Sequence, residues 1–230
     1  MKTFLGITAN LDGPGIINTI FDHADRGPIM ARFIARKLWE FFAHPSPPPG
    51  VITALATEFR SSGYELKPLL RALFLRPEFY LPAAKQGLVR SPIEWVVAVL
   101  KATGLDAAAA NPEWFVETMG QQPYSPPNVA GWKSNAYWIS ATAASARADW
   151  SGYVAYKAST AGFLGTTASQ TPTTAIDNAF AAFNIDRPTT GTRNALIAWL
   201  TGQRTVLYTD WLEPRNLILL MALSPEMQLA

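Results

Sequence analysis

Residues 91–104 read SPIEWVVAVLKATG, and this stretch carries signals for both ends of a helix. Ser91, followed by Pro92 and by Glu94 three residues after the serine, is the pattern of a capping box with proline in the first helical turn. Gly104 is typical of a residue that ends a helix. We therefore predict a helix that begins after Ser91 and stops at Gly104.

Similar signals recur on both sides of this stretch. Asn111-Pro112-Glu113 resembles a second helix start. In contrast, Ala107 to Ala110 are predicted to form a weak linker, and residues 13–15 are predicted to form a turn. Apolar residues at helical spacing predict further helices, at 28–43, 50–63, 65–75, 113–119, 136–158, 175–184, 193–200 and 214–223. A short strand is possible in TVLYT at 205–209.

These elements predict an all-α fold, a compact domain of about eight to ten helices over 1–230. The Ser/Thr/Gly-rich residues 159–174 favour a flexible surface connection. A long loop rich in Pro, Gly and aromatic residues at 121–135 is predicted to lie on the surface.

The composition narrows the classes of function. Hydrophobic residues make up 49% of the chain and charged residues 16%, which argues against disorder. The net charge of +2 is too balanced for the basic surface of a nucleic-acid-binding protein, so no nucleic-acid partner is expected. The chain has no cysteine, no apolar run long enough to span a membrane, and an opening too short for a signal peptide.

The strongest candidate site is the segment 120–138, which reads GQQPYSPPNVAGWKSNAYW. Flat aromatic faces beside amide groups suit a sugar ring or a peptide strand, because both need stacking and neutral hydrogen bonds. The alternative is that the tryptophans anchor the loop to the core, and we expect at least one of Trp132 and Trp138 to be largely buried. The predicted ligand-binding residues are Tyr124, Asn128, Trp132, Asn135, Tyr137 and Trp138.

A second candidate is a basic stripe of Arg32, Arg36 and Trp39, which share a helix face if the segment is helical. Such arginines bind carboxylates or phosphates, but the favoured interpretation is an intramolecular pair with a nearby acid such as Glu40 or Glu94.

Glu94, Glu113 and Glu117 could in principle supply an acid/base pair, although helix capping explains the first two. His23 and His44 lack a second ligand at metal spacing, so neither a metal site nor a cofactor is predicted.

The sequence also contains one pattern twice, which we call the internal echo. LLRALFLRPEFYL at 69–81 matches LILLMALSPEMQL at 217–229, since each is an apolar helix followed by Leu-x-Pro-Glu. Proline and glutamate at the first two positions of a new helical turn explain the shared pattern. Two copies of one helix pair, or chance similarity of two apolar helices, would both produce it.

Three segments together resemble a known bacterial family, the domain of unknown function 1800. They are ARFIARKLWEFF at 31–42, LLRALFLRPEF at 69–79 with SPIEWVV at 91–97, and MGQQPYSPPNVAGW at 119–132. The resemblance covers nearly the whole chain, thins between about 155 and 205, and matches the C-terminal half of a longer family pattern.

The resemblance implies a helical fold and a periplasmic or secreted location, which the chain itself does not reveal. It also implies a possible partner, either a sulfatase-like exported protein encoded nearby or the family's N-terminal half. It implies no reaction.

Three hypotheses about function remain open. The first is an extracytoplasmic binding or assembly module that uses the aromatic, amide-rich loop. The second is a hydrolase acting on polysaccharide, with Glu94 or Glu117 as acid/base. The third is an inert helical scaffold.

Overall fold

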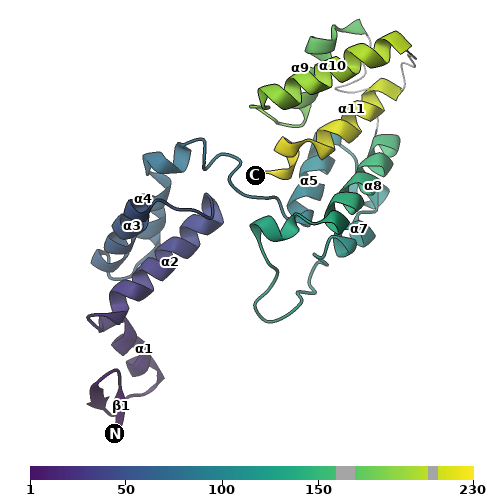
Figure 1. The fold of residues 1–230 in the computed structure, drawn as a ribbon. Coiled ribbons are helices and arrows are strands. Elements are labelled where there is room, and N and C mark those ends of the chain that lie inside the picture. The colour runs from purple at the N-terminus through teal and green to yellow at the C-terminus, as the bar shows by residue number, and fades with distance from the viewer. Residues whose placement is uncertain (159–168, 207–211) are drawn as a thin grey trace. The chain divides into compact units, whose positions relative to one another are not determined.

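The computed structural model describes residues 1–158, 169–206 and 212–230, which divide into two units, Met1–Gly87 and Leu88–Ala230 (Figure 1). Within these described residues there are eleven α-helices, nine of them seven residues or longer, and a single short hairpin. The predicted all-α class is therefore confirmed.

The capping box at Ser91 has the predicted geometry. Helix α5 (Pro92–Thr103) begins where the Ser91 hydroxyl accepts a bond from the Glu94 backbone N–H at 3.4 Å, and the Glu94 carboxylate accepts one from the Ser91 backbone N–H at 2.8 Å. Gly104 ends the helix in the left-handed conformation, with φ at +66°. Local sequence alone is sufficient to place this helix, because both of its ends are made by neighbouring side chains.

The N-terminal unit is built on three helices, α2 (Arg26–Phe42), α3 (Pro49–Ser61) and α4 (Leu66–Phe74), preceded by α1 (Gly13–Asp22). Helix α3 packs against both α2 and α4, and α1 packs against α2. Small residues on α2 let the helices approach closely, and the fully buried side chains between them include Ala31, Ala35, Trp39, Leu69 and Leu73.

The unit also contains a hairpin that the sequence analysis missed. Strands β1 (Lys2–Phe4) and β2 (Ile7–Ala9) pair antiparallel, with Thr3 opposite Thr8. Leu5 and Gly6 both have positive φ, which a two-residue hairpin turn requires. Three-residue strands are too short for an alternating pattern to be recognised.

The C-terminal unit contains α5, α6 (Ala107–Ala110), α7 (Glu113–Thr118), α8 (Ala141–Lys157), α9 (Pro172–Ala182), α10 (Thr190–Val206) and α11 (Leu212–Leu223). Helix α11 packs against α8, and the two lie side by side in yellow and green in Figure 1. Trp95 and Trp150 are fully buried, with ring centroids 5.4 Å apart. Their indole N–H groups donate to the carbonyls of Ala222 and Ala110, so each tryptophan joins distant parts of the chain.

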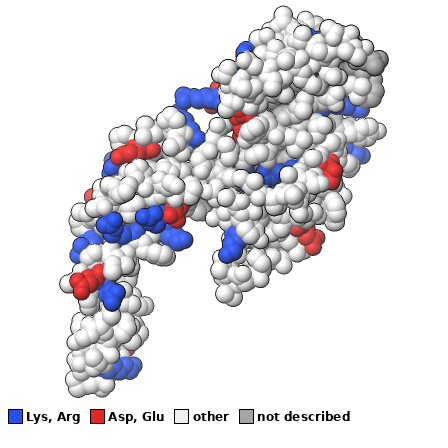
Figure 2. All heavy atoms as spheres, viewed as in Figure 1, with Lys and Arg blue, Asp and Glu red and all other residues white. Residues whose placement is uncertain are grey.

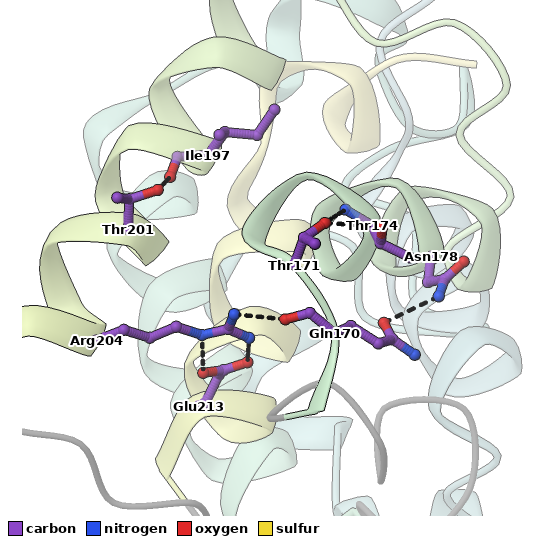
Figure 3. Close-up of polar contacts among 8 residues, drawn as sticks. All are labelled: Gln170, Thr171, Thr174, Asn178, Ile197, Thr201, Arg204 and Glu213. Atoms are coloured by element: carbon purple, nitrogen blue, oxygen red, sulfur yellow. Dashed lines mark hydrogen bonds and ion pairs between the residues drawn. The ribbon is translucent and has the colours of Figure 1, made fainter.

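A buried ion pair joins α10 to α11 in the C-terminal unit. Figure 3 shows the Arg204 guanidinium forked onto the Glu213 carboxylate, at 2.7 and 3.0 Å, while it also donates to the Gln170 carbonyl. The Glu213 side chain is only 4% exposed. Removing one partner of a buried pair leaves an uncompensated charge, so this contact fixes the start of α11 against α10.

Several predicted boundaries are corrected by the structure. Ala107 to Ala110 form α6 rather than a linker, and residues 13–15 form the first turn of α1, where the Asp12 carboxylate accepts a bond from the Gly15 N–H. Asn111 does not cap α7; it ends α6 in the left-handed conformation that asparagine tolerates.

The predicted helix at 136–158 is divided in two. The 3-10 helix η2 (Asn135–Trp138) comes first, and α8 begins only after Ser140, whose hydroxyl caps it. Thr205 and Val206 end α10 and do not start a strand, while 207–209 of that prediction lie outside the described residues. Residues 159–168 of the predicted flexible connection also lie outside them, and Pro172 to Thr174 open α9.

The internal echo is visible in the local structure. Helix α4 is followed by the 3-10 helix η1 (Pro77–Tyr80), and α11 by η4 (Pro225–Gln228), with proline first and glutamate second in each. The two glutamates differ in their surroundings. Glu78 pairs with Arg76 at 2.8 Å, whereas Glu226 is 3% exposed and accepts a bond from the Thr189 N–H.

Candidate functional site

The loop between α7 and η2 is fixed at both ends. On one side the Gln121 side-chain oxygen accepts a bond from the Ile93 N–H at 2.9 Å. On the other, the Asn135 side-chain oxygen accepts one from the Val89 N–H at 2.8 Å, and the Trp138 indole is buried at 3% exposure. The expectation that Trp132 or Trp138 is largely buried is therefore confirmed by Trp138.

The loop also has internal order. The Asn128 side-chain oxygen accepts a bond from the Ala130 N–H at 2.9 Å, and the Asn128 carbonyl accepts one from Gly131 at 3.0 Å. Tyr124 has a positive φ of 62° and Asn135 one of 55°. The side-chain oxygens of Asn128 and Asn135, two of the predicted ligand-binding residues, thus accept bonds from the protein's own backbone.

Large apolar side chains stand in solvent along and just after this loop. Tyr124 is fully exposed, and Tyr137 and Ile139 are 62% and 70% exposed. Val129 is fully exposed as well. We call Tyr124, Val129, Tyr137 and Ile139 the apolar loop residues. Trp132 is only partly exposed, with its indole nitrogen buried. The loop projects from the helices of its unit in Figure 1.

A pocket of about 370 Å³ adjoins the end of the loop and lies within the C-terminal unit. Most of its lining is apolar, contributed by η2, α8 and the end of the chain. Among the described residues that line it there is no acidic side chain. The lining residues are Trp138, Ile139, Ser140, Ala144, Arg147, Leu223, Pro225, Gln228 and Leu229.

Arg147 is the charged residue of this pocket, and it is only 4% exposed. Its Nη2 donates to the Arg90 carbonyl at 2.9 Å, its Nη1 donates to the Gln228 side chain, and its guanidinium lies 5.2 Å from the Trp95 ring centroid. Burial lowers the pKa of Arg147 to about 10, so the group is a cation at neutral pH.

Sequence reasoning did not single out Arg147, although a signal exists. On α8 it lies four residues after Ala143 and three before Trp150, both buried, so it belongs to the apolar stripe of the helix. A charged residue within such a stripe indicates either a buried partner or a buried site.

The family model described as protein of unknown function (DUF1800) matches residues 1–229. The chain belongs to this family. The DUF1800 match runs through 155–205, where no motif was recognised in the sequence. The chain matches no curated protein and no solved structure. Membership of the DUF1800 family therefore shows which proteins this chain is related to, but it does not assign a reaction to the chain.

The predicted basic stripe divides between surface and core. Arg32 and Arg36 are exposed on α2 of this DUF1800 chain, but Trp39 is fully buried in the core of the N-terminal unit. Arg36 lies 3.7 Å from Glu40, the intramolecular pair that the sequence had allowed. The indole therefore faces inward and the two guanidinium groups lie on the solvent side.

Of the candidate carboxylates and histidines, Glu94 and the two histidines make local structural contacts. Glu94 belongs to the capping box. Helix α7 begins without a side-chain cap, so the capping role expected of Glu113 is not formed, and Glu113 and Glu117 are both exposed. The His23 ring accepts a bond from the Asp25 N–H at 3.1 Å, and the His44 ring one from the Ser46 N–H at 3.3 Å. Across the described ranges, no three His, Cys, Asp or Glu residues gather as metal ligands would, and no helix could cross a membrane.

Proposed function

We propose that this DUF1800 chain is an assembly module that binds a protein partner through the apolar loop residues. The observation that carries the proposal is the combination of fixed loop ends with large apolar side chains left in solvent. Large apolar side chains exposed along one ordered segment are a feature of interaction sites. A loop that is already ordered loses little further entropy when a partner binds.

A protein segment suits this loop better than a sugar does. Val129 and Ile139 are aliphatic and offer no flat face for a sugar ring. The side-chain oxygens of Asn128 and Asn135 already accept backbone bonds, which reduces the set of polar groups left for hydroxyls. Apolar contacts with tyrosines among them are characteristic of protein interfaces.

The hydrolase alternative has less support. Glycoside hydrolysis needs two carboxyl groups facing one another across a cleft. No acidic residue in the described part of the chain lines the pocket beside the loop, and Glu94 is engaged at the start of α5. Figure 2 shows charged side chains of both signs with wide areas of uncharged surface between them, which fits contact through an uncharged surface.

The first partner to test is the sulfatase-like exported protein that the family resemblance implies, and the proposal places both proteins outside the cytoplasm. Purified chain and partner would be titrated by calorimetry. Tyr124→Ala is expected to weaken binding by about tenfold, since a central aromatic contributes this much to an interface.

A matched control is Tyr156→Ala, which removes another tyrosine, 65% exposed, from α8 outside the loop. It should leave the affinity unchanged. Equal affinity for both variants and the unaltered chain would contradict a loop-based interface. Binding of a neutral oligosaccharide that Tyr124→Ala abolishes would replace the protein partner with a sugar.

A further inference from the structure

The pocket beside the loop contains a charge that no described acidic residue neutralises. Arg147 lines it at 4% exposure, and none of the other described lining residues is acidic. Four ion pairs occur among the described residues, and none of them includes Arg147. A buried cation is costly unless an anion or a full set of acceptors compensates it.

The contacts that Arg147 makes with the described residues are all with neutral groups. The Arg90 carbonyl and the Gln228 side chain each accept one bond, and Trp95 offers its ring face. The Nε atom is buried and makes no bond with any described residue. Guanidinium has five N–H donors, so more than half of its donor capacity remains.

A structural role explains only part of this arrangement. The two bonds connect α8 to Arg90 and to Gln228, near the place where Val89 and Leu229 form a bridge. Neutral donors could make such bonds without the cost of burying a charge. The charge itself is therefore the feature that a ligand would explain.

We propose that this pocket binds a small apolar monocarboxylate, with its carboxylate on the Arg147 guanidinium and its hydrocarbon part along Trp138, Ala144 and Leu223. The planar guanidinium matches a carboxylate in shape and charge and forms paired, charge-assisted bonds with it. The apolar walls select the hydrocarbon part. The volume of about 370 Å³ lies within the usual range of small-molecule pockets.

This site does not depend on the proposed protein partner. Of the apolar loop residues, only Ile139 lines the pocket, whereas Tyr124, Val129 and Tyr137 do not. Tyr124→Ala should therefore leave carboxylate binding unchanged. An experiment that contradicts the carboxylate site therefore does not contradict the protein interface, and the reverse also holds.

The test compares octanoate with octanamide, which has the same chain and no charge, by calorimetry on the full chain. Octanoate should bind, and octanamide should bind at least about tenfold more weakly, because a charge-assisted bond is lost. Arg147→Met keeps much of the side-chain volume and should weaken octanoate binding by a similar factor. Arg60→Met removes the same charge from the exposed surface of α3 and should change nothing.

A second variant guards against misfolding of Arg147→Met. Ala144→Trp starts from an exposed residue of α8, fills the pocket and leaves Arg147 in place. It should abolish octanoate binding while the thermal midpoint stays close to that of the unaltered chain. No octanoate binding, equal binding of octanamide, unchanged binding by Arg147→Met, or equal binding of inorganic phosphate would each overturn the proposal.

Discussion

At the scale of single residues, Trp138 holds the loop to the C-terminal unit. Its side chain is 3% exposed, while its neighbour Tyr137 is 62% exposed. We predict that Trp138→Ala lowers the free energy of unfolding by about 3–5 kcal/mol, because a large buried aromatic leaves a cavity. Urea denaturation measures the change.

Tyr137→Ala is the matched control for this prediction. It removes an adjacent aromatic that is mostly in solvent, so the loss should stay below about 1 kcal/mol. Equal losses for the two variants would mean that Trp138 does not anchor the loop.

Glu226 makes the stability of the fold depend on pH in the acidic range. Burial by itself would raise the pKa of Glu226, but the hydrogen bonds donated by the Thr189 backbone N–H and by nearby groups outweigh it and lower the pKa. A carboxyl whose pKa is lower in the folded state stabilises the fold above its unfolded pKa. That stability is lost as the pH falls through the lowered value.

Glu226→Gln should therefore be less stable than the unaltered chain at neutral pH, and the difference should shrink in acid. Thermal unfolding followed at several pH values measures this. Glu58→Gln, on the exposed surface of α3, removes the same charge as a control. The lowered pKa of Glu226 would be contradicted if the difference in thermal midpoint between Glu226→Gln and the unaltered chain stayed constant with pH.

At the scale of elements, α1 and α2 meet at a point where no side chain fits. A Cβ added to Gly27 would lie 2.3 Å from the Phe21 carbonyl oxygen, and the Tyr64 hydroxyl also donates to that oxygen at 2.6 Å. Gly27→Ala should destabilise the N-terminal unit by about 1–3 kcal/mol, because the backbone must shift.

Gly152 supplies the opposite case within α8. A Cβ there would meet no atom within 4 Å, so Gly152→Ala should raise stability by up to about 1 kcal/mol, through helix propensity. Denaturant midpoints of the two variants should therefore move in opposite directions. Midpoints that move together would contradict this account.

The echoed segments show how far a local pattern extends. Both copies form an α-helix followed by a 3-10 turn, because proline and glutamate favour that turn wherever it occurs. The surroundings of the two glutamates, however, differ. Glu78 pairs with an arginine two residues away, whereas Glu226 accepts a bond from Thr189, 37 residues away in sequence.

At the scale of the whole molecule, each unit has its own hydrophobic core. Trp39 with Leu69 and Leu73 is buried in one, and Trp95 with Trp150 in the other. We predict that residues 88–230 expressed alone remain helical by circular dichroism and unfold cooperatively, as a unit with its own core should. A gradual, non-cooperative loss of signal would instead support the single domain expected from the sequence.

The sequence by itself determined the all-α class, the family and the helix ends that neighbouring residues make. Ser91 with Glu94 and Gly104 are examples, because their partners lie within a few residues. It also indicated that a tryptophan anchors the long loop. These inferences succeed because helix caps and apolar periodicity are local properties of the chain.

Only the tertiary structure decided the candidate sites. It buried Trp39 and left Arg36 in solvent, and it used Asn135 to bind Val89, 46 residues away. It also brought Arg147 of α8 to Gln228, 81 residues later, and so formed the pocket. Periodicity could place Arg147 on an apolar stripe, but the groups opposite that stripe come from distant segments, and packing alone determines which ones they are.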